Sequence, residues 1–264
     1  METMRITEKR KSSTGVIIGL LVFFIIGAAI LFFALKSEKE PEVVGKNNDT
    51  EVQSLVDVDA QKEETINKNK AIDYSVVDKK IKDVSSSKMK ANITIPVISI
   101  DNTELTQINS EINTYYTEMF NSLKSKMATA SSNYTYTVTY NAYDNIVGTR
   151  KIISVTIYER IIDDSAKKNT MNKIKTYNID AATKEEVTQS DLAQEIFGKD
   201  YKTIIRDKIK EYVVSNKMMK ESEFLYTYTG LKPFYIKNNE FHVLFNEGEL
   251  VDSKYGVVDI TVKE

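Results

Sequence analysis

The chain has 264 residues, 28% of them charged, with a formal net charge of −2. This near balance argues against a nucleic-acid-binding protein, which would carry a strong basic excess. The absence of cysteine excludes a disulfide-held fold, and one histidine without cysteine cannot form a typical structural zinc site.

An uncharged apolar run extends from Gly15 to Leu35, a span of 21 residues. As a helix it would be about 31 Å long, which matches the hydrocarbon core of a bilayer. The alternative is a cleaved signal peptide, but a cut after Ala34 would place bulky Phe32 where a small residue is needed. We therefore expect an uncleaved transmembrane helix at residues 15–35.

Basic residues flank this run on its N-terminal side, whereas the other flank carries charges of both signs. The basic residues are Arg5, Lys9, Arg10 and Lys11. The positive-inside rule then places residues 1–14 in the cytoplasm and everything from Lys36 onward outside the cell. The expected localisation is a single-pass protein of the cell membrane.

Residues 36–71 alternate small polar and charged side chains and contain no aromatic residue. Such a composition cannot offset the entropy of ordering, so we expect a disordered extracellular tether. The alternative is a marginal helix from about Val52 to Ile66, which would make the tether stiffer.

The folded extracytoplasmic part is expected at residues 72–264, with a further division into subdomains 72–185 and 186–264 as an option. Strands are expected at Asp73–Val84, Met89–Ile100, Tyr134–Tyr143, Arg150–Arg160, Ile174–Ile179, Phe234–Lys237, Glu240–Phe245 and Gly256–Val262, with helices at Glu104–Met127 and Lys199–Asn216. The order β-β-α-β-β-β-α-β-β-β predicts an α+β fold, with antiparallel sheet covered by two helices.

Two periodic patterns predict which side chains are buried. The first helix carries an apolar stripe of Leu105, Ile108, Ile112, Tyr115, Met119, Leu123 and Met127. In the strand that begins at Tyr134, tyrosines and valine alternate with threonines, so we expect one buried face and one hydroxylated face toward water. The tyrosines could instead form a carbohydrate platform, but the core interpretation is favoured.

Several ordered segments resemble one bacterial exported domain. They are Pro96-Val97-Ile98, Tyr177-Asn178-Ile179-Asp180, Thr183-Lys184, Val187-Thr188, Asp191-Leu192, Phe234-Tyr235-Ile236, and Phe241 to Phe245 with Glu249. The domain they resemble is the extracellular part of the anti-sigma-V factor, a lysozyme receptor, and the accessory region of PdaC-type peptidoglycan deacetylases. The resemblance covers residues 72–264 and implies a ligand that is a cell-wall glycan or a wall-cleaving protein such as lysozyme.

The sequence also departs from that family. Residues 161–166 replace a Gly-Gly-Ala-His loop, and Asp252 and Ser253 stand where many members have Pro-Tyr. We therefore expect weak or absent binding to lysozyme itself. The tail of residues 1–14 is too short to fold around a sigma factor, so an anti-sigma role for this chain alone is not expected.

No catalytic residue, metal ligand or cofactor site is indicated by any motif. The single histidine, His242, alternates with Phe241 and Val243 and is interpreted as a surface residue of a sheet. The expected function is thus a membrane-anchored binding or sensing module without catalysis. One alternative is a wall hydrolase with two paired carboxylates, and another is a structural or assembly protein of the envelope.

The expected binding site is the loop Asn246–Gly256, which is longer than a hairpin needs. Its candidate residues are Glu249, Asp252, Ser253, Tyr255 and Gly256. Tyr226 and Tyr228, in a loop before Pro233, are further candidates because we expect them to be exposed.

Overall fold

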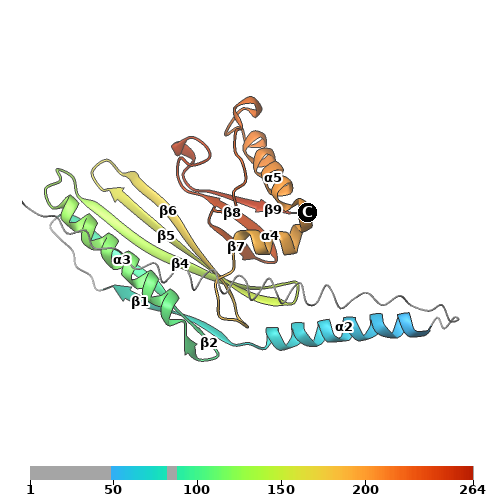
Figure 1. Cartoon of the computed structure of the whole chain (residues 1–264). Coiled ribbons are helices and arrows are strands. Elements are labelled where there is room, and N and C mark those ends of the chain that lie inside the picture. Colours follow the sequence, from blue (N-terminus) through green and yellow to red (C-terminus); the bar gives the residue numbers. More distant parts are fainter. Residues whose placement is uncertain (1–48, 82–87, 264) are drawn as a thin grey trace, which may run out of the picture. The chain divides into compact units, whose positions relative to one another are not determined.

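The structure, a computed structural model, describes residues 49–81 and 88–263 (Figure 1). The chain divides into two compact units, Met1–Val52 and Gln53–Glu264, and of the first only the start of one helix is described. The elements of the described residues are α2 (Asp49–Lys70), β1 (Tyr74–Ile81), β2 (Met89–Ile100), β3 (Thr103–Glu104), α3 (Thr106–Met127), β4 (Tyr134–Val147), β5 (Arg150–Asp163), β6 (Lys168–Asp180), α4 (Gln189–Phe197), η1 (Gly198–Asp200), α5 (Tyr201–Ser215), η2 (Glu221–Glu223), β7 (Phe234–Lys237), β8 (Glu240–Phe245), η3 (Ser253–Tyr255) and β9 (Val258–Val262).

The α+β class expected from the sequence is confirmed, and each strand and helix expected within residues 72–264 is found. The sequence did not predict the two-residue strand β3 or a full helix at α4. The hairpin between β7 and β8 turns at Asn238 and Asn239, with φ angles of 52° and 61°. Asparagine tolerates this left-handed conformation better than most residues, which explains the tight turn.

The larger sheet has the strand order β1-β2-β4-β5-β6, with β3 added beside β2. All its pairs are antiparallel except β2 with β4, which run parallel over Met89–Ile93. The antiparallel sheet expected from the sequence therefore contains one parallel pair. The reason is that α3 lies between these strands in the chain and supplies the crossover that a parallel pair requires.

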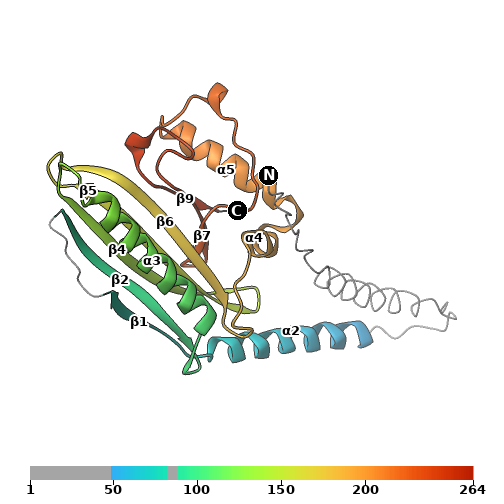
Figure 2. The ribbon, with the colours of Figure 1, turned by 60° about the vertical axis from the view of Figure 1, so that its left-hand side comes forward.

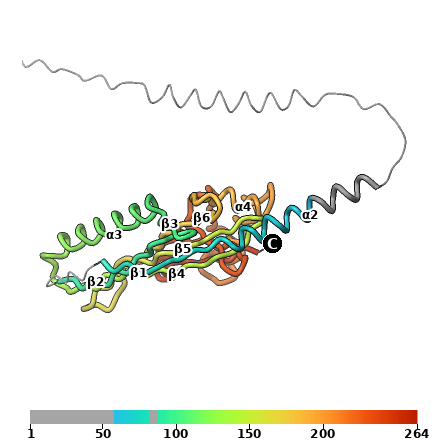
Figure 3. Tube along the Cα trace, turned by 90° about the horizontal axis from the view of Figure 1, so that it is seen from below, coloured from blue at the N-terminus to red at the C-terminus, as the bar shows by residue number. Residues whose placement is uncertain are grey.

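The helix α3 covers one face of the larger sheet, here called the inner face (Figure 3). Ile112 and Leu123 of the expected stripe are buried, but the fully packed positions also include Tyr116 and Phe120. The expected inward residues Ile108, Tyr115, Met119 and Met127 are only partly buried. The spacing of the buried residues shows a stripe that is displaced by about one residue from the predicted one.

The opposite, outer face of the larger sheet was expected to face water, and in its middle this expectation is wrong. Ser154 and Thr156 on β5 have no exposed surface. The strand β7 lies against them, since the amide of Ile236 donates to Ser154 Oγ at 3.0 Å. The hydroxyl groups therefore face another part of the chain instead of solvent. Figure 2 shows β7, α4 and α5 beyond β6, while α3 crosses the other side of the sheet.

The smaller sheet has the order β7-β8-β9 and is antiparallel throughout. Its own hydrophobic core lies between this sheet and the helices α4 and α5 and includes Leu192, Ile205, Ile209, Phe241 and Ile260. Most of this second core comes from the residues after 185, but Val147 and Ile152 of the larger sheet also belong to it. Both sheets lie in the same compact unit.

The tether expected at residues 36–71 is wrong for its second half, where α2 occupies Asp49–Lys70. The alternative helix at Val52–Ile66 is the one that forms, and it is longer than expected. Glutamate, glutamine and lysine give the segment good helix propensity. Its C-terminal end is also bonded to the sheet, because Lys151 Nζ donates to the carbonyls of Ile72 at 2.7 Å and Lys70 at 3.3 Å.

The predicted cytoplasmic tail at residues 1–14, the membrane helix at 15–35 and the first part of the tether lie outside the described residues. Across residues 49–81 and 88–263, no helix combines the length and apolar character that crossing a membrane requires.

Candidate functional site

The predicted loop Asn246–Gly256 is well packed. Leu250 and Val251 are buried in the smaller core, with 9% and 7% of their surface exposed. Asp252 then caps the short helix η3 by accepting a 2.9 Å bond from the Lys254 amide. The loop is thus a folded surface element.

Glu249 is bonded within this loop. Its Oε2 accepts the Asn246 amide at 2.9 Å and lies 3.3 Å from Lys232 Nζ. Partial burial acts to raise the pKa of Glu249, but the bonds from Asn246 and Lys232 outweigh it and leave the pKa lowered. These contacts give Glu249 a structural role in shaping the turn.

Two tyrosines expected to be exposed are not. Tyr228 has 7% of its surface exposed, and the ring of Tyr226 packs edge-on against Phe245 at 5.3 Å. Burial raises the pKa of Tyr226 to about 12, and the charge of Glu249 adds to this shift. Both rings belong to the wall of the smaller core, so the sequence prediction of an exposed aromatic loop is wrong.

Tyr255 and Gly256 lie at the end of the loop. The Tyr255 hydroxyl donates to the Lys217 carbonyl at 3.2 Å, which joins η3 to the residues after α5. Gly256 has a φ of 68°, and a side chain there would come 3.6 Å from Asn172 Nδ2 of β6. The end of the loop thus lies against the residues after α5 and close to β6.

A different region has the shape of a binding site. Two pockets, of about 430 Å³ and 500 Å³, share Glu186, which lies between β6 and α4. The first is lined by β6, the residues before α4 and the segment leading into β7, and the second by the start of α3 and residues 184–186. We call these two pockets together the Glu186 site.

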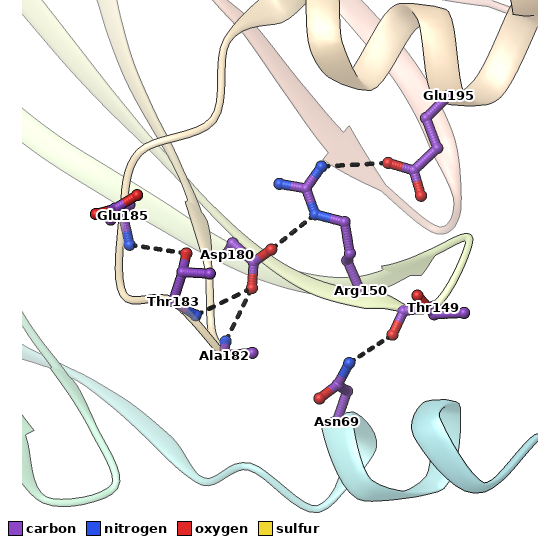
Figure 4. Close-up of polar contacts among 8 residues, drawn as sticks. All are labelled: Asn69, Thr149, Arg150, Asp180, Ala182, Thr183, Glu185 and Glu195. Atoms are coloured by element: carbon purple, nitrogen blue, oxygen red, sulfur yellow. Dashed lines mark hydrogen bonds and ion pairs between the residues drawn. The ribbon is translucent and has the colours of Figure 1, made fainter. Parts of the chain in front are cut away.

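The turn from Asp180 to Glu186 positions this site (Figure 4). Asp180 Oδ1 accepts the Ala182 amide at 2.9 Å, and Asp180 Oδ2 lies 2.7 Å from Arg150 Nε. Arg150 also contacts Glu195 of α4 at 3.2 Å. One guanidinium group thus joins the larger sheet, the turn and α4.

The Glu186 side chain makes no hydrogen bond or ion pair with any described residue. Desolvation in the pocket raises its pKa, repulsion by Glu111 raises it further, and Lys175 acts in the opposite direction. Glu111, in contrast, accepts Lys175 Nζ at 2.9 Å and the Tyr177 hydroxyl at 3.0 Å. The bond from Lys175 is the main reason why the pKa of Glu111 is lowered. The two carboxyl groups therefore differ in proton affinity.

The first pocket also contains the start of α4. Thr188 caps this helix by accepting the Asp191 amide at 3.1 Å. Gln189 follows with 2% of its surface exposed, and neither atom of its side-chain amide has a partner among the described residues. Lys232 and the strongly exposed Leu231 line the same pocket. The site therefore offers charged, amide and apolar contacts.

His242 was expected on the surface but has only 8% of its surface exposed. It does point away from Phe241 and Val243, yet that side of the smaller sheet packs against the larger one. Its Nδ1 lies 3.0 Å from Asp259, which also accepts the Tyr235 hydroxyl at 2.6 Å. In the described part of the chain, no three residues of the types His, Cys, Asp or Glu are placed to hold a metal ion.

The sequence did not single out Glu186 or Gln189. They stand beside Val187 and Thr188, which were noted for the family resemblance, and the pair Glu185–Glu186 before a helix cap was the signal available. Nothing in the sequence showed that α3 would bring Glu111 to the same place, because 75 positions separate the two glutamates in the chain.

No protein-family model and no curated protein matches the chain. Among solved structures, a member of the DUF3298 family from Bacteroides fragilis NCTC 9343 is similar at 14% identity and a TM-score of 0.43, covering 73% of this chain and 90% of that one. A DUF3298 family protein from Pseudomonas aeruginosa PAO1 is similar at 8% identity and a TM-score of 0.47, covering 74% of this chain and 91% of that one.

Proposed function

We propose that residues 72–264 form an extracytoplasmic binding module, anchored to the membrane by residues 15–35, that binds a fragment of the cell wall in the Glu186 site. The ligand class comes from the residue pattern that resembles the anti-sigma-V and PdaC-type domains. The observation that carries the proposal is Glu186 itself, an ionisable group in a concave site whose side chain forms no hydrogen bond or ion pair with any described residue.

The chemistry of the site supports a ligand of this kind. Glycan hydroxyl and amide groups can donate to Glu186, and carboxylates of a wall peptide can approach Lys232 and the start of α4. Leu231, with 84% of its surface exposed, adds apolar contact at the rim. A wall-cleaving protein is the alternative partner, and it would cover the rim instead of entering the pockets.

The test is retention of residues 53–264 on purified peptidoglycan and on soluble wall fragments. Glu186→Gln keeps the shape but removes the charge, so the affinity should fall by about tenfold or more. Glu118→Gln, on the exposed side of α3, is the matched control and should bind normally. Absence of binding by the unaltered chain would refute the proposal, and retention of a muramidase alone would make the partner a protein.

A hydrolase is the second candidate, and one observation favours it. Glu186 and Glu111 have pKa values shifted in opposite directions, as in the acid and base pairs of glycosidases. The observation against it is that Glu111 is already bonded to Lys175 and Tyr177. Release of reducing sugar ends from peptidoglycan that disappears in both Glu186→Gln and Glu111→Gln would establish catalysis, and no release by the unaltered chain would exclude it.

A further inference from the structure

Polar side chains on the outer face of the larger sheet bond directly to the backbone of β7, where this strand crosses the face. Asn178 Nδ2 donates to the Phe234 carbonyl at 2.7 Å, and Asn145 Nδ2 donates to the Ile236 carbonyl at 2.9 Å. Thr176 Oγ1 accepts the Phe234 amide at 3.2 Å. The face thus binds an extended segment through its peptide groups.

The same face continues beyond β7 with side chains of the same kind. Residues two apart on a strand share a face, so Thr137 and Thr139 of β4, Arg160 of β5 and Asn172 of β6 belong to it. They line a pocket of about 380 Å³ together with Tyr158 and Asn169. The threonines and Asn172 make no side-chain hydrogen bond with any described residue, so their donors and acceptors are free.

Arg160 adds a charge to this pocket. Its Nε donates to Asn169 Oδ1 at 2.8 Å, and no carboxylate within the described chain forms an ion pair with it. A guanidinium group has five donors in a planar arrangement that fits a carboxylate. The bond to Asn169 uses one of them and orients the side chain, which leaves the others for a ligand.

We propose that this half of the outer face binds an extended acidic peptide of a partner protein. The peptide groups of that segment form hydrogen bonds with the side chains of Thr139 and Asn172, and one of its carboxylates pairs with Arg160. The way β7 lies on the adjoining part of the face is the precedent within the chain. A glycan fits less well, because Tyr158 is already packed against the cluster of Ile174, Tyr235 and Leu244. Its ring is therefore not a free platform for a sugar.

The experiment uses the full-length chain in a mild detergent and a fluorescent peptide of about six residues that alternates glutamate and valine. That length is enough to cross three strands. We expect saturable binding, measured by fluorescence polarisation, that weakens at least tenfold in Arg160→Gln. Binding should also weaken in Thr139→Val, which removes only the hydroxyl group. A lysine–valine peptide should not bind.

Two controls distinguish this surface from general charge attraction and from the Glu186 site. Arg206→Gln removes an exposed arginine that is paired with Asp207 on α5, and Glu186→Gln alters the Glu186 site, so both should leave peptide binding unchanged. Hydrogen exchange on addition of peptide should slow in β4 around Thr139 and in β5 around Arg160. Absence of saturable binding, equal binding by Arg160→Gln, or displacement of the bound peptide by chitotetraose would each overturn the proposal.

Discussion

Ser154 Oγ donates a 2.6 Å hydrogen bond to Asn178 Oδ1 in the middle of the larger sheet, and both side chains also bond to the main chain of β7. Each polar atom of this group has a partner, although both residues are at most 1% exposed. Because a buried polar group without a partner is costly, the network both satisfies these side chains and fixes where the smaller sheet lies.

Asn178→Ala should therefore destabilise residues 53–264 by about 2–3 kcal/mol, since it leaves the Ser154 hydroxyl without an acceptor and the Phe234 carbonyl without its donor. Asn141→Ala is the matched control, because Asn141 lies on the same sheet face but is exposed. Urea unfolding of the two variants measures the difference. Equal losses of stability would show that the network contributes nothing.

Gly230 and Gly198 allow a test of the close contact beside the first pocket. Their φ angles are 72° and 70°, so alanine at either position should cost about 1 kcal/mol in backbone strain. A side chain at Gly230 would also come 2.5 Å from Ser190 Oγ, whereas at Gly198 it would meet nothing within 4 Å. We expect Gly230→Ala to be clearly the more destabilising change in thermal unfolding.

The double variant Gly230→Ala with Ser190→Ala removes the hydroxyl that the new side chain would strike. It should recover part of the stability lost in Gly230→Ala alone. Failure to recover any stability would mean that the contact with Ser190 is not what limits this position.

The buried carboxyl group of Glu159 should contribute to the pH dependence of the unfolding free energy. It is 2% exposed and accepts the Tyr136 hydroxyl at 2.9 Å. Burial raises its pKa above the ordinary value of 4.5, although the bond from Tyr136 and the charge of Lys173 oppose the shift. The folded state then binds the proton more tightly than the unfolded state, so this component stabilises the fold as the pH falls through the raised pKa toward 4.5.

Glu159→Gln should abolish this component. The unfolding free energy of the unaltered chain minus that of the variant should therefore rise as the pH is lowered from about 8 toward about 4. Taking the difference cancels the contributions of other carboxyl groups, such as Glu111. Parallel stability curves for the two proteins would contradict the raised pKa of Glu159.

Ile112→Ala tests the core beneath α3. Ile112 has no exposed surface, so truncation should cost about 2–5 kcal/mol. Glu118→Ala, on the exposed side of the same helix, should change stability by less than about 0.5 kcal/mol. Chemical unfolding of both variants checks the assignment, and an unaltered melting temperature for Ile112→Ala would show that it is wrong.

The local elements could be predicted because their signals lie within a few residues. The turn Asn238-Asn239 and the alternation of Tyr136 and Val138 with threonines each specify a strand or hairpin by themselves. The buried outer face could not be predicted in this way. Ser154 and Thr156 look like solvent-facing residues until β7, about 80 residues later in the chain, is known to cross them.

The Glu186 site could not be predicted from the sequence for the same reason. The binding site was predicted at residues 246–256 because that loop is long. The length of a loop does not show that Leu250 and Val251 are buried in the core. Glu186 and Glu111 come together only through the packing of α3 against the larger sheet. The α2 helix was only the alternative prediction for this segment, because polar composition does not reveal that the end of the helix is bonded to the fold.

The most direct test of an extracytoplasmic binding module uses the absence of cysteine from the chain. A single cysteine introduced as Gln107→Cys would lie at the rim of the second pocket, where Gln107 is exposed. Thr7→Cys and Asp207→Cys provide controls for the expected cytoplasmic tail and for an exposed position on α5. Labelling with a membrane-impermeant maleimide on intact protoplasts should modify positions 107 and 207 but not 7, and soluble wall fragments should slow labelling at 107 alone. Labelling of position 107 only after lysis, or labelling that wall fragments do not slow, would contradict an extracytoplasmic module that binds the wall.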